Sequence, residues 1–376
     1  MQTKSKVGWA LAGSVLMLAG PLAMTGCENG SRSSRDDRFQ TTAVDLENDP
    51  YYQSGLRLVW RAYPQVGERA RPLYCDVLGG DLAFQDTSNT LSLIEGTTGR
   101  VRWTAALGQP LERFLGAARE GETVITASES ELQFLDIQNG QLLDRQRLDP
   151  LANTRPVVIW PLAVMGSATG EVFAHDMRVG VRVWSVDLRG PINAPVVSLG
   201  GDDIGAVSEG GEVIMLDAGS GTSGGRRATL FDGMATAPVT DGAQLYVAGL
   251  DQSVWAYRIE NGRRSWRHRT QSELTAQPVI GGGVLVLHAA REGLIGLNAQ
   301  TGERLWSQPD ARGDGVVASD TSATLWDGQT LTVVSLRDGS IRSQVELPGI
   351  KWVYPGQEGV VFAVAENGVV SKYEPL

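Results

Sequence analysis

The sequence predicts an all-β protein, an eight-bladed β-propeller of four-stranded antiparallel blades, with seven blades as the alternative. Three observations indicate this fold: a turn that recurs about every 40 residues, short β-type runs between the turns, and two chain ends that complement each other. The segment "NAQTGERLWS" (298–307) is one copy of the turn, with a glycine followed four residues later by tryptophan.

The recurring turn fixes the period of the repeat. Its glycine occurs at Gly99, Gly140, Gly180, Gly221, Gly262, Gly302 and Gly339, in steps of 41, 40, 41, 41, 40 and 37 residues. Four of these glycines have tryptophan four residues later, namely Trp103, Trp184, Trp266 and Trp306, whereas Asp144, Gly225 and Ser343 take that place in the other repeats. Glycine permits the positive φ of such a turn. We interpret the tryptophans as side chains that cover the gap between adjacent blades.

Each interval contains four runs of strand length. In the fifth repeat, "TAPVTD", "QLYVAGL", "SVWAYRI" and "RRSWRHR" are separated by turn residues, and no convincing amphipathic stretch of helical length is present. Four short strands in 40 residues predict one antiparallel sheet per repeat, and such sheets are arranged radially in a propeller.

The two ends of the repeat region predict an eighth blade. Residues 351–376 supply about three strands and stop before reaching a turn and a fourth strand. The segment "SGLRLVW" (54–60) contains Gly55 and an apolar run ending in Trp60, which matches the missing strand. Pairing the two ends would close the ring and remove an exposed sheet edge. We therefore assign residues 51–376 to a single propeller domain.

The first 50 residues are predicted to lie outside the propeller. Lys4 and Lys6 precede an apolar stretch, and small residues lead up to Cys27, which predicts a signal peptide over residues 1–26. The segment "MTGC" resembles a bacterial lipobox and implies lipidation of Cys27, palmitate included, with a secretory signal and a bystander cysteine as the alternative. Residues 27–50 are polar and predict a flexible tether.

Charge and cysteine content narrow the possible partners. Without Lys4 and Lys6, 31 basic residues remain against 43 acidic ones, a net charge of −12. Such a surface argues against nucleic acid and anionic lipid head groups as partners. If Cys27 carries lipid, Cys75 has no disulfide partner, and its apolar neighbours predict a buried thiol.

The sequence offers no recognisable catalytic site. His175, His268 and His288 lie in different repeats without metal-ligand spacing. Nucleophile-elbow, phosphate-loop and calcium-loop patterns are absent from the sequence. We therefore predict no catalytic residue, metal, cofactor or small-molecule substrate.

The unit "GLNAQTGERLW" (296–306) resembles the tryptophan-docking repeat of the pyrroloquinoline-quinone-type propellers, and the likeness extends over nearly all of residues 54–376. One branch of that family comprises quinone-dependent alcohol and sugar dehydrogenases, whose adjacent cysteines and long site insertions this chain lacks. The other branch, typified by the BamB-like lipoproteins of outer-membrane protein assembly, has the same order of lipobox, tether and eight-bladed ring. Since a fold hosts many functions, the repeat alone does not choose between branches.

A local match favours the second branch. The segment "SVDLRGPINAPVV" (185–197) is similar to the one with which BamB-like proteins dock on the periplasmic domains of the barrel-inserting protein. The resemblance implies contacting roles for Val186, Leu188 and Arg189. It also implies a role for Asp232, the one acidic residue retained where the branch has two.

The predicted protein is thus a non-enzymatic scaffold, anchored by lipid to the outer membrane and facing the periplasm, whose partner is the barrel-insertion machinery. A propeller lipoprotein acting as an adaptor in signalling, adhesion or polysaccharide handling is the first alternative, and a quinone-dependent dehydrogenase is the second. In a propeller, connections 187–193 and 230–236 should adjoin turn 208–212 on the face opposite the recurring glycine turns.

Overall fold

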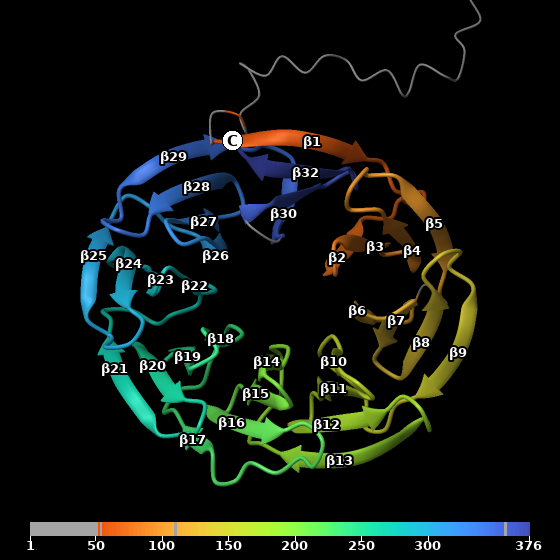
Figure 1. Ribbon diagram of the computed structural model, residues 1–376, viewed down its shortest axis with the longest axis horizontal. Helices are drawn as coiled ribbons and strands as arrows, with labels where there is room; N and C mark the ends of the chain where they lie inside the picture. Colours follow the sequence, from red (N-terminus) through yellow and green to blue (C-terminus); the bar gives the residue numbers. More distant parts are fainter. Residues whose placement is uncertain (1–51, 53–54, 109–110, 357–358) are drawn as a thin grey trace, which may run out of the picture. The chain divides into compact units, whose positions relative to one another are not determined.

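The computed structural model describes residues 52, 55–108, 111–356 and 359–376. The span Asp45–Leu376 is one compact unit. Its described strands form eight four-stranded antiparallel sheets around a central axis (Figure 1). The eight-bladed prediction is confirmed, and the seven-bladed alternative is wrong. The predicted signal peptide and tether, including Cys27, lie outside the described residues.

Each blade has four strands, which we letter A to D from the axis outward. Blade 1 consists of β2 (Pro72–Leu78), β3 (Asp81–Asp86), β4 (Thr90–Ile94) and β5 (Val101–Ala106). Blade 2 consists of β6 (Phe114–Glu120), β7 (Thr123–Ser128), β8 (Glu131–Asp136) and β9 (Leu142–Arg147). Blade 3 consists of β10 (Val157–Ile159), β11 (Leu162–Gly166), β12 (Glu171–Asp176) and β13 (Val181–Asp187). Blade 4 consists of β14 (Val197–Gly200), β15 (Asp203–Val207), β16 (Glu212–Asp217) and β17 (Arg227–Thr229).

The next three blades repeat this order. Blade 5 consists of β18 (Val239–Thr240), β19 (Gln244–Gly249), β20 (Ser253–Arg258) and β21 (Arg264–Arg269). Blade 6 consists of β22 (Val279–Gly281), β23 (Val284–Ala289), β24 (Gly293–Asn298) and β25 (Arg304–Gln308). Blade 7 consists of β26 (Asp314–Ala318), β27 (Ser322–Trp326), β28 (Thr330–Ser335) and β29 (Ile341–Glu346).

Blade 8 is built from both ends of the propeller. Strands β30 (Ile350–Pro355), β31 (Val361–Ala365) and β32 (Val370–Pro375) come from the C-terminal end, and β1 (Leu56–Ala62) supplies strand D. Strand β1 runs antiparallel to β32, and the N–H of Leu376 donates to the carbonyl of Gly55 at 2.9 Å. The ring closure expected from the two chain ends is therefore present.

The recurring glycines share one conformation. All seven have φ between 68° and 74°. The N–H of each donates to the carbonyl of the residue four positions earlier, at 2.8 to 2.9 Å. A side chain with a Cβ is strained at this φ, so glycine sets the geometry of each C-to-D turn.

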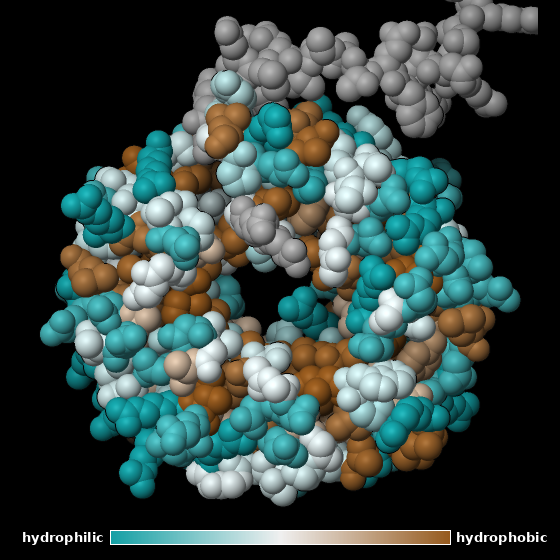
Figure 2. Space-filling model, viewed as in Figure 1, coloured by the Kyte–Doolittle hydropathy of each residue, from teal (hydrophilic) through white to brown (hydrophobic). Residues whose placement is uncertain are grey.

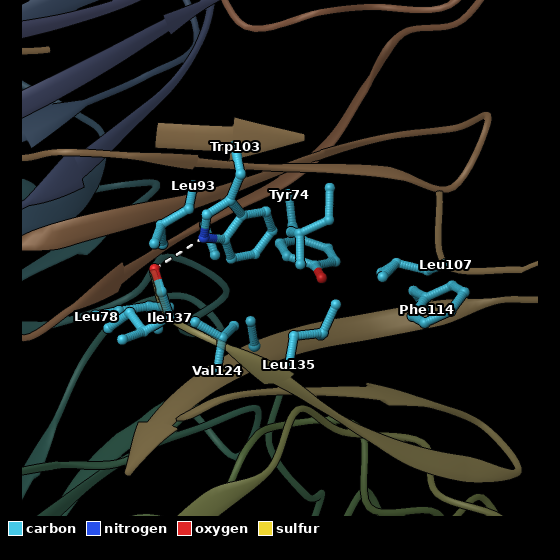
Figure 3. Packing of buried hydrophobic residues seen from close by; sticks show 12 residues of the cluster. Tyr74, Leu78, Leu93, Trp103, Leu107, Phe114, Val124, Leu135 and Ile137 are labelled. Carbon is cyan, nitrogen blue, oxygen red and sulfur yellow. Dashed lines mark hydrogen bonds between the residues drawn. The ribbon is translucent and has the colours of Figure 1, made fainter. Parts of the chain in front are cut away.

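Tryptophans of strand D join five of the eight blades to the next blade. The indole Nε1–H of Trp103 donates to the carbonyl of Ile137 at 2.8 Å, and the indole lies among apolar side chains of blades 1 and 2 (Figure 3). A methyl group on Gly140 would lie only 2.6 Å from that ring. The same bond, at 2.7 to 3.0 Å, is made by Trp60, Trp184, Trp266 and Trp306. The glycine turn thus also provides the flat surface that receives an indole.

Two junctions use a different side chain for this bond. Gln146 donates through Nε2 to the carbonyl of Met177 at 2.8 Å. Arg226 donates through Nη1 to the carbonyl of Ile259 at 3.3 Å and also pairs with Asp203. Both acceptor carbonyls belong to the residue three positions before a turn glycine, as at the tryptophan junctions. The acceptor position is therefore the same at these junctions, although the donor side chain differs.

The core lies between the blades as a series of apolar clusters. Cys75 is fully buried in one of them and is not in a disulfide, and its burial raises the pKa of the thiol. Among the described residues, no helix is both long and apolar enough to span a membrane.

Candidate partner-binding surface

Three loops that the repeat pattern expects to be neighbours are in contact. They are the D-to-A connections 187–193 and 230–236 and the B-to-C turn 208–212, which we call the docking rim. The N–H of Gly210 donates to the carbonyl of Arg189 at 3.1 Å, and the N–H of Leu230 donates to that of Gly211 at 2.7 Å. Both connections are therefore held against the same turn.

Glycine makes this close stacking possible. A methyl group on Gly210 would lie 2.1 Å from the carbonyl oxygen of Arg189, and one on Gly233 would lie 2.1 Å from that of Glu209. Gly233 also has a φ of 81°, which favours glycine. The rim is thus a packed backbone layer from which the intervening side chains project.

Arg189 is the exposed cation of the docking rim. Its backbone N–H donates to the Glu212 carboxylate at 2.6 Å, which fixes the loop. Its Nη2 donates to the carbonyl of Gly210 at 3.4 Å, and no ion pair to its guanidinium occurs among the described residues. Asp232 is also exposed, on the neighbouring connection. Both side chains are available to a partner.

Leu188 lies mostly buried beneath the docking rim. Only 6 % of its surface is exposed, and it packs in the cluster between blades 3 and 4. Val186 is half-buried against the same cluster. These two residues support the rim from below, and the contacting roles that the resemblance implies for them stay predictions.

The position of Leu188 recurs as a buried leucine in other blades. Buried leucines at the same place end strand D of four other blades: Leu107, Leu148, Leu230 and Leu347. Each of the five donates its backbone N–H to the B-to-C turn of its own blade, at 2.7 to 2.9 Å. The leucine of the "LRG" segment therefore closes the end of a blade, as it does elsewhere in the ring.

Phe231 is a rim residue that the sequence reasoning missed. It is 90 % exposed and follows the buried Leu230, just as Arg189 follows Leu188. Aligning the repeats on the leucine would have placed both residues at one projecting position. The resemblance concerns only the acidic residues of this connection and therefore points to Asp232 alone.

The three histidines are partly or fully buried within the propeller. His175 contacts Gln146 at 2.9 Å and His268 contacts the carbonyl of Gly302 at 3.0 Å, so both lie at blade junctions. Burial lowers the pKa of His175, His268 and His288. Among the described residues, no group of three or more His, Cys, Asp or Glu side chains could hold a metal ion.

Polar cavities are also present away from the docking rim. Two adjoining cavities of about 620 and 390 Å³ share the lining residues His288, Arg312 and Asp327. Arg312 and Asp327 pair with each other at 2.9 Å. On the face shown in Figure 2, hydrophilic, intermediate and hydrophobic residues are interspersed around a central opening.

Comparison with known proteins agrees with the fold. The model of the family described as outer membrane protein assembly factor BamB matches residues 53–167 and 168–327. The chain belongs to this family. The crystal structure of BamB from Moraxella catarrhalis superposes with a TM-score of 0.67 at 17 % identity, covering 85 % of this chain and 97 % of that protein. The crystal structure of the computationally designed Ika8 protein superposes with a TM-score of 0.64 at 15 % identity, covering 82 % of this chain and 97 % of that chain.

Curated relatives share modest identity with this member of the BamB family. The outer membrane protein assembly factor BamB of Bordetella pertussis is 23 % identical over 374 residues, which cover 97 % of this chain and 86 % of the relative. Its counterpart from Burkholderia pseudomallei is 25 % identical over 160 residues, 41 % of each chain. The protein from Yersinia pestis is 23 % identical over 255 residues, 64 % of this chain and 63 % of the relative.

Proposed function

We propose that this protein is a non-enzymatic adaptor that assists the assembly of outer-membrane β-barrel proteins by docking on the machinery that inserts them. The observation that carries the proposal is the exposed Arg189, on a loop fixed by Glu212 and Gly210, in a chain of the BamB family. A guanidinium is well suited to this role because its planar fork forms bidentate pairs with carboxylates and stacks on aromatic rings. Asp232 adds a charge of opposite sign nearby in the rim, which would favour one orientation of the partner.

We further propose that Cys27 carries lipid and that residues 27–50 tether the propeller to the periplasmic side of the outer membrane. Support comes from the "MTGC" segment after an apolar stretch and from the polar composition of the residues that follow. A tether of about 23 residues would span roughly 25–30 Å, which keeps the ring close to the membrane. Docking at the rim then needs no contact between the propeller and lipid.

The substitution Arg189→Glu is expected to reduce at least tenfold the amount of barrel-insertion protein that co-purifies with this chain. The substitution reverses the charge of an exposed side chain, and surface changes of this kind usually alter stability by no more than about 0.5 kcal/mol. The measurement is quantitative mass spectrometry of proteins captured with the tethered chain from crosslinked membranes, together with a thermal melt of each variant.

Arg263→Glu is the matched control, because Arg263 is exposed in a C-to-D turn and the charge change is the same. It should retain the partner. Normal capture by Arg189→Glu, or unfolding of that variant, would show that the docking surface lies elsewhere. Capture of a partner outside barrel assembly by the unchanged protein would favour a propeller adaptor of another system.

A further inference from the structure

We infer that Phe231 and Leu151 are apolar anchors on either side of Arg189, and that the partner is a folded protein offering two apolar pockets around a carboxylate. This inference rests on the proposed function and specifies the partner surface that it requires. The three residues come from consecutive D-to-A connections, those that follow blades 2, 3 and 4.

The connection that carries Leu151 is joined to the loop of Arg189 by the side chain of Asn153. Leu151 is 61 % exposed and lies two residues before Asn153. The Nδ2 of Asn153 donates to the carbonyl of Ile192 and to Oδ1 of Asn193, both at 2.9 Å. The connection after blade 2 is thereby fixed against the one after blade 3.

Backbone hydrogen bonds fix the chain on both sides of Phe231. Leu230 before it is buried and bonded to the turn of blade 4. Gly233 after it packs on the carbonyl of Glu209 and accepts a hydrogen bond from the N–H of Leu250 at 2.9 Å. The ring of Phe231 therefore projects from a fixed backbone, which limits the entropy lost when a partner binds it.

A single exposed hydrophobic side chain is ordinary on a soluble protein. Phe231 differs because it occupies the position after the blade-closing leucine, where the preceding blade places Arg189. An aromatic ring and an arginine within one fixed surface are the residue types that dominate binding energy at protein interfaces. Exposed Glu209 and Asp232 supply the polar border that such anchors usually have.

The charges of the docking rim indicate which group of the partner would lie opposite Arg189. No ion pair of the described residues neutralises its guanidinium, whereas the acidic border would repel a uniformly acidic surface. A complementary partner therefore places one carboxylate opposite Arg189 and apolar pockets opposite Leu151 and Phe231. This arrangement fits a folded protein surface better than a lipid surface, which offers no such alternation.

The test is the affinity of each variant for the purified periplasmic domains of the barrel-insertion protein, measured by biolayer interferometry. Phe231→Ser should raise the dissociation constant at least tenfold and Leu151→Ser severalfold, and Phe231→Leu should retain most of the affinity. Leu143→Ser and Leu305→Ser are matched controls, because these leucines are 56 % and 49 % exposed on outer strands β9 and β25. Both controls should bind normally.

The outcomes separate this inference from the proposed function. Normal binding by Phe231→Ser and Leu151→Ser, with weakened binding by Arg189→Glu, would overturn the anchors and leave the function intact. Normal binding by all three variants would contradict the rim as the docking surface. A lowered melting temperature for Phe231→Ser would show that its ring packs on the protein itself and would also overturn the inference.

Discussion

A chain lacking residues 51–62 is expected to form oligomers and aggregates. The deletion removes β1, which exposes the edge of β32 and leaves the apolar surface that Leu56 and Trp60 cover. Unpaired sheet edges are sites of intermolecular strand pairing. Size-exclusion chromatography with light scattering and a thermal melt would measure the effect.

A chain lacking residues 28–50 is the control for this deletion. It retains β1, so we expect a monomer with the melting temperature of the full-length protein. If the deletion of residues 51–62 is as soluble and as stable as this control, closure by β1 does not hold the ring together.

Trp103→Ala is expected to lower the free energy of unfolding by about 3–5 kcal/mol, the usual cost of truncating a buried tryptophan. The indole is 8 % exposed, covers Gly140 and donates to the carbonyl of Ile137. The change therefore leaves a cavity between blades 1 and 2 and an acceptor without its donor. Urea denaturation followed by tryptophan fluorescence and circular dichroism would measure the loss.

Gln146→Ala tests the same junction site one blade further on. Gln146 keeps the hydrogen bond but covers less apolar surface than an indole, so we expect a loss of about 1 kcal/mol. Equal losses for Trp103→Ala and Gln146→Ala would contradict the view that indole burial stabilises the junctions.

The regular part of the fold could be predicted because each repeat carries its own evidence. Glycine is strongly favoured at the positive φ of the C-to-D turns, which makes the repeat visible in the sequence, and Trp60 marks strand β1 as part of blade 8. The side chains that donate in place of tryptophan at two junctions are harder to recognise in the sequence. Gln146 and Arg226 stand six and five residues after their glycines, and comparison at a fixed offset of four residues overlooks them.

The docking rim could be predicted only in part. Strand order places its three loops together, but burial decides which side chains a partner can reach. Leu188 and Arg189 are adjacent in the sequence, yet one closes a blade and the other projects. Phe231 has no counterpart in the resemblance, because loop side chains vary while the backbone that supports them recurs.

The most direct test of the proposed docking is site-specific photo-crosslinking in living cells. A photoreactive amino acid at position 232 lies on the docking rim, whereas one at position 300 lies in a C-to-D turn on the opposite face. We predict that the barrel-insertion protein is crosslinked from position 232 and not from position 300, as identified by mass spectrometry. Crosslinks to that protein from position 300 alone, or none from position 232, would contradict docking through the rim.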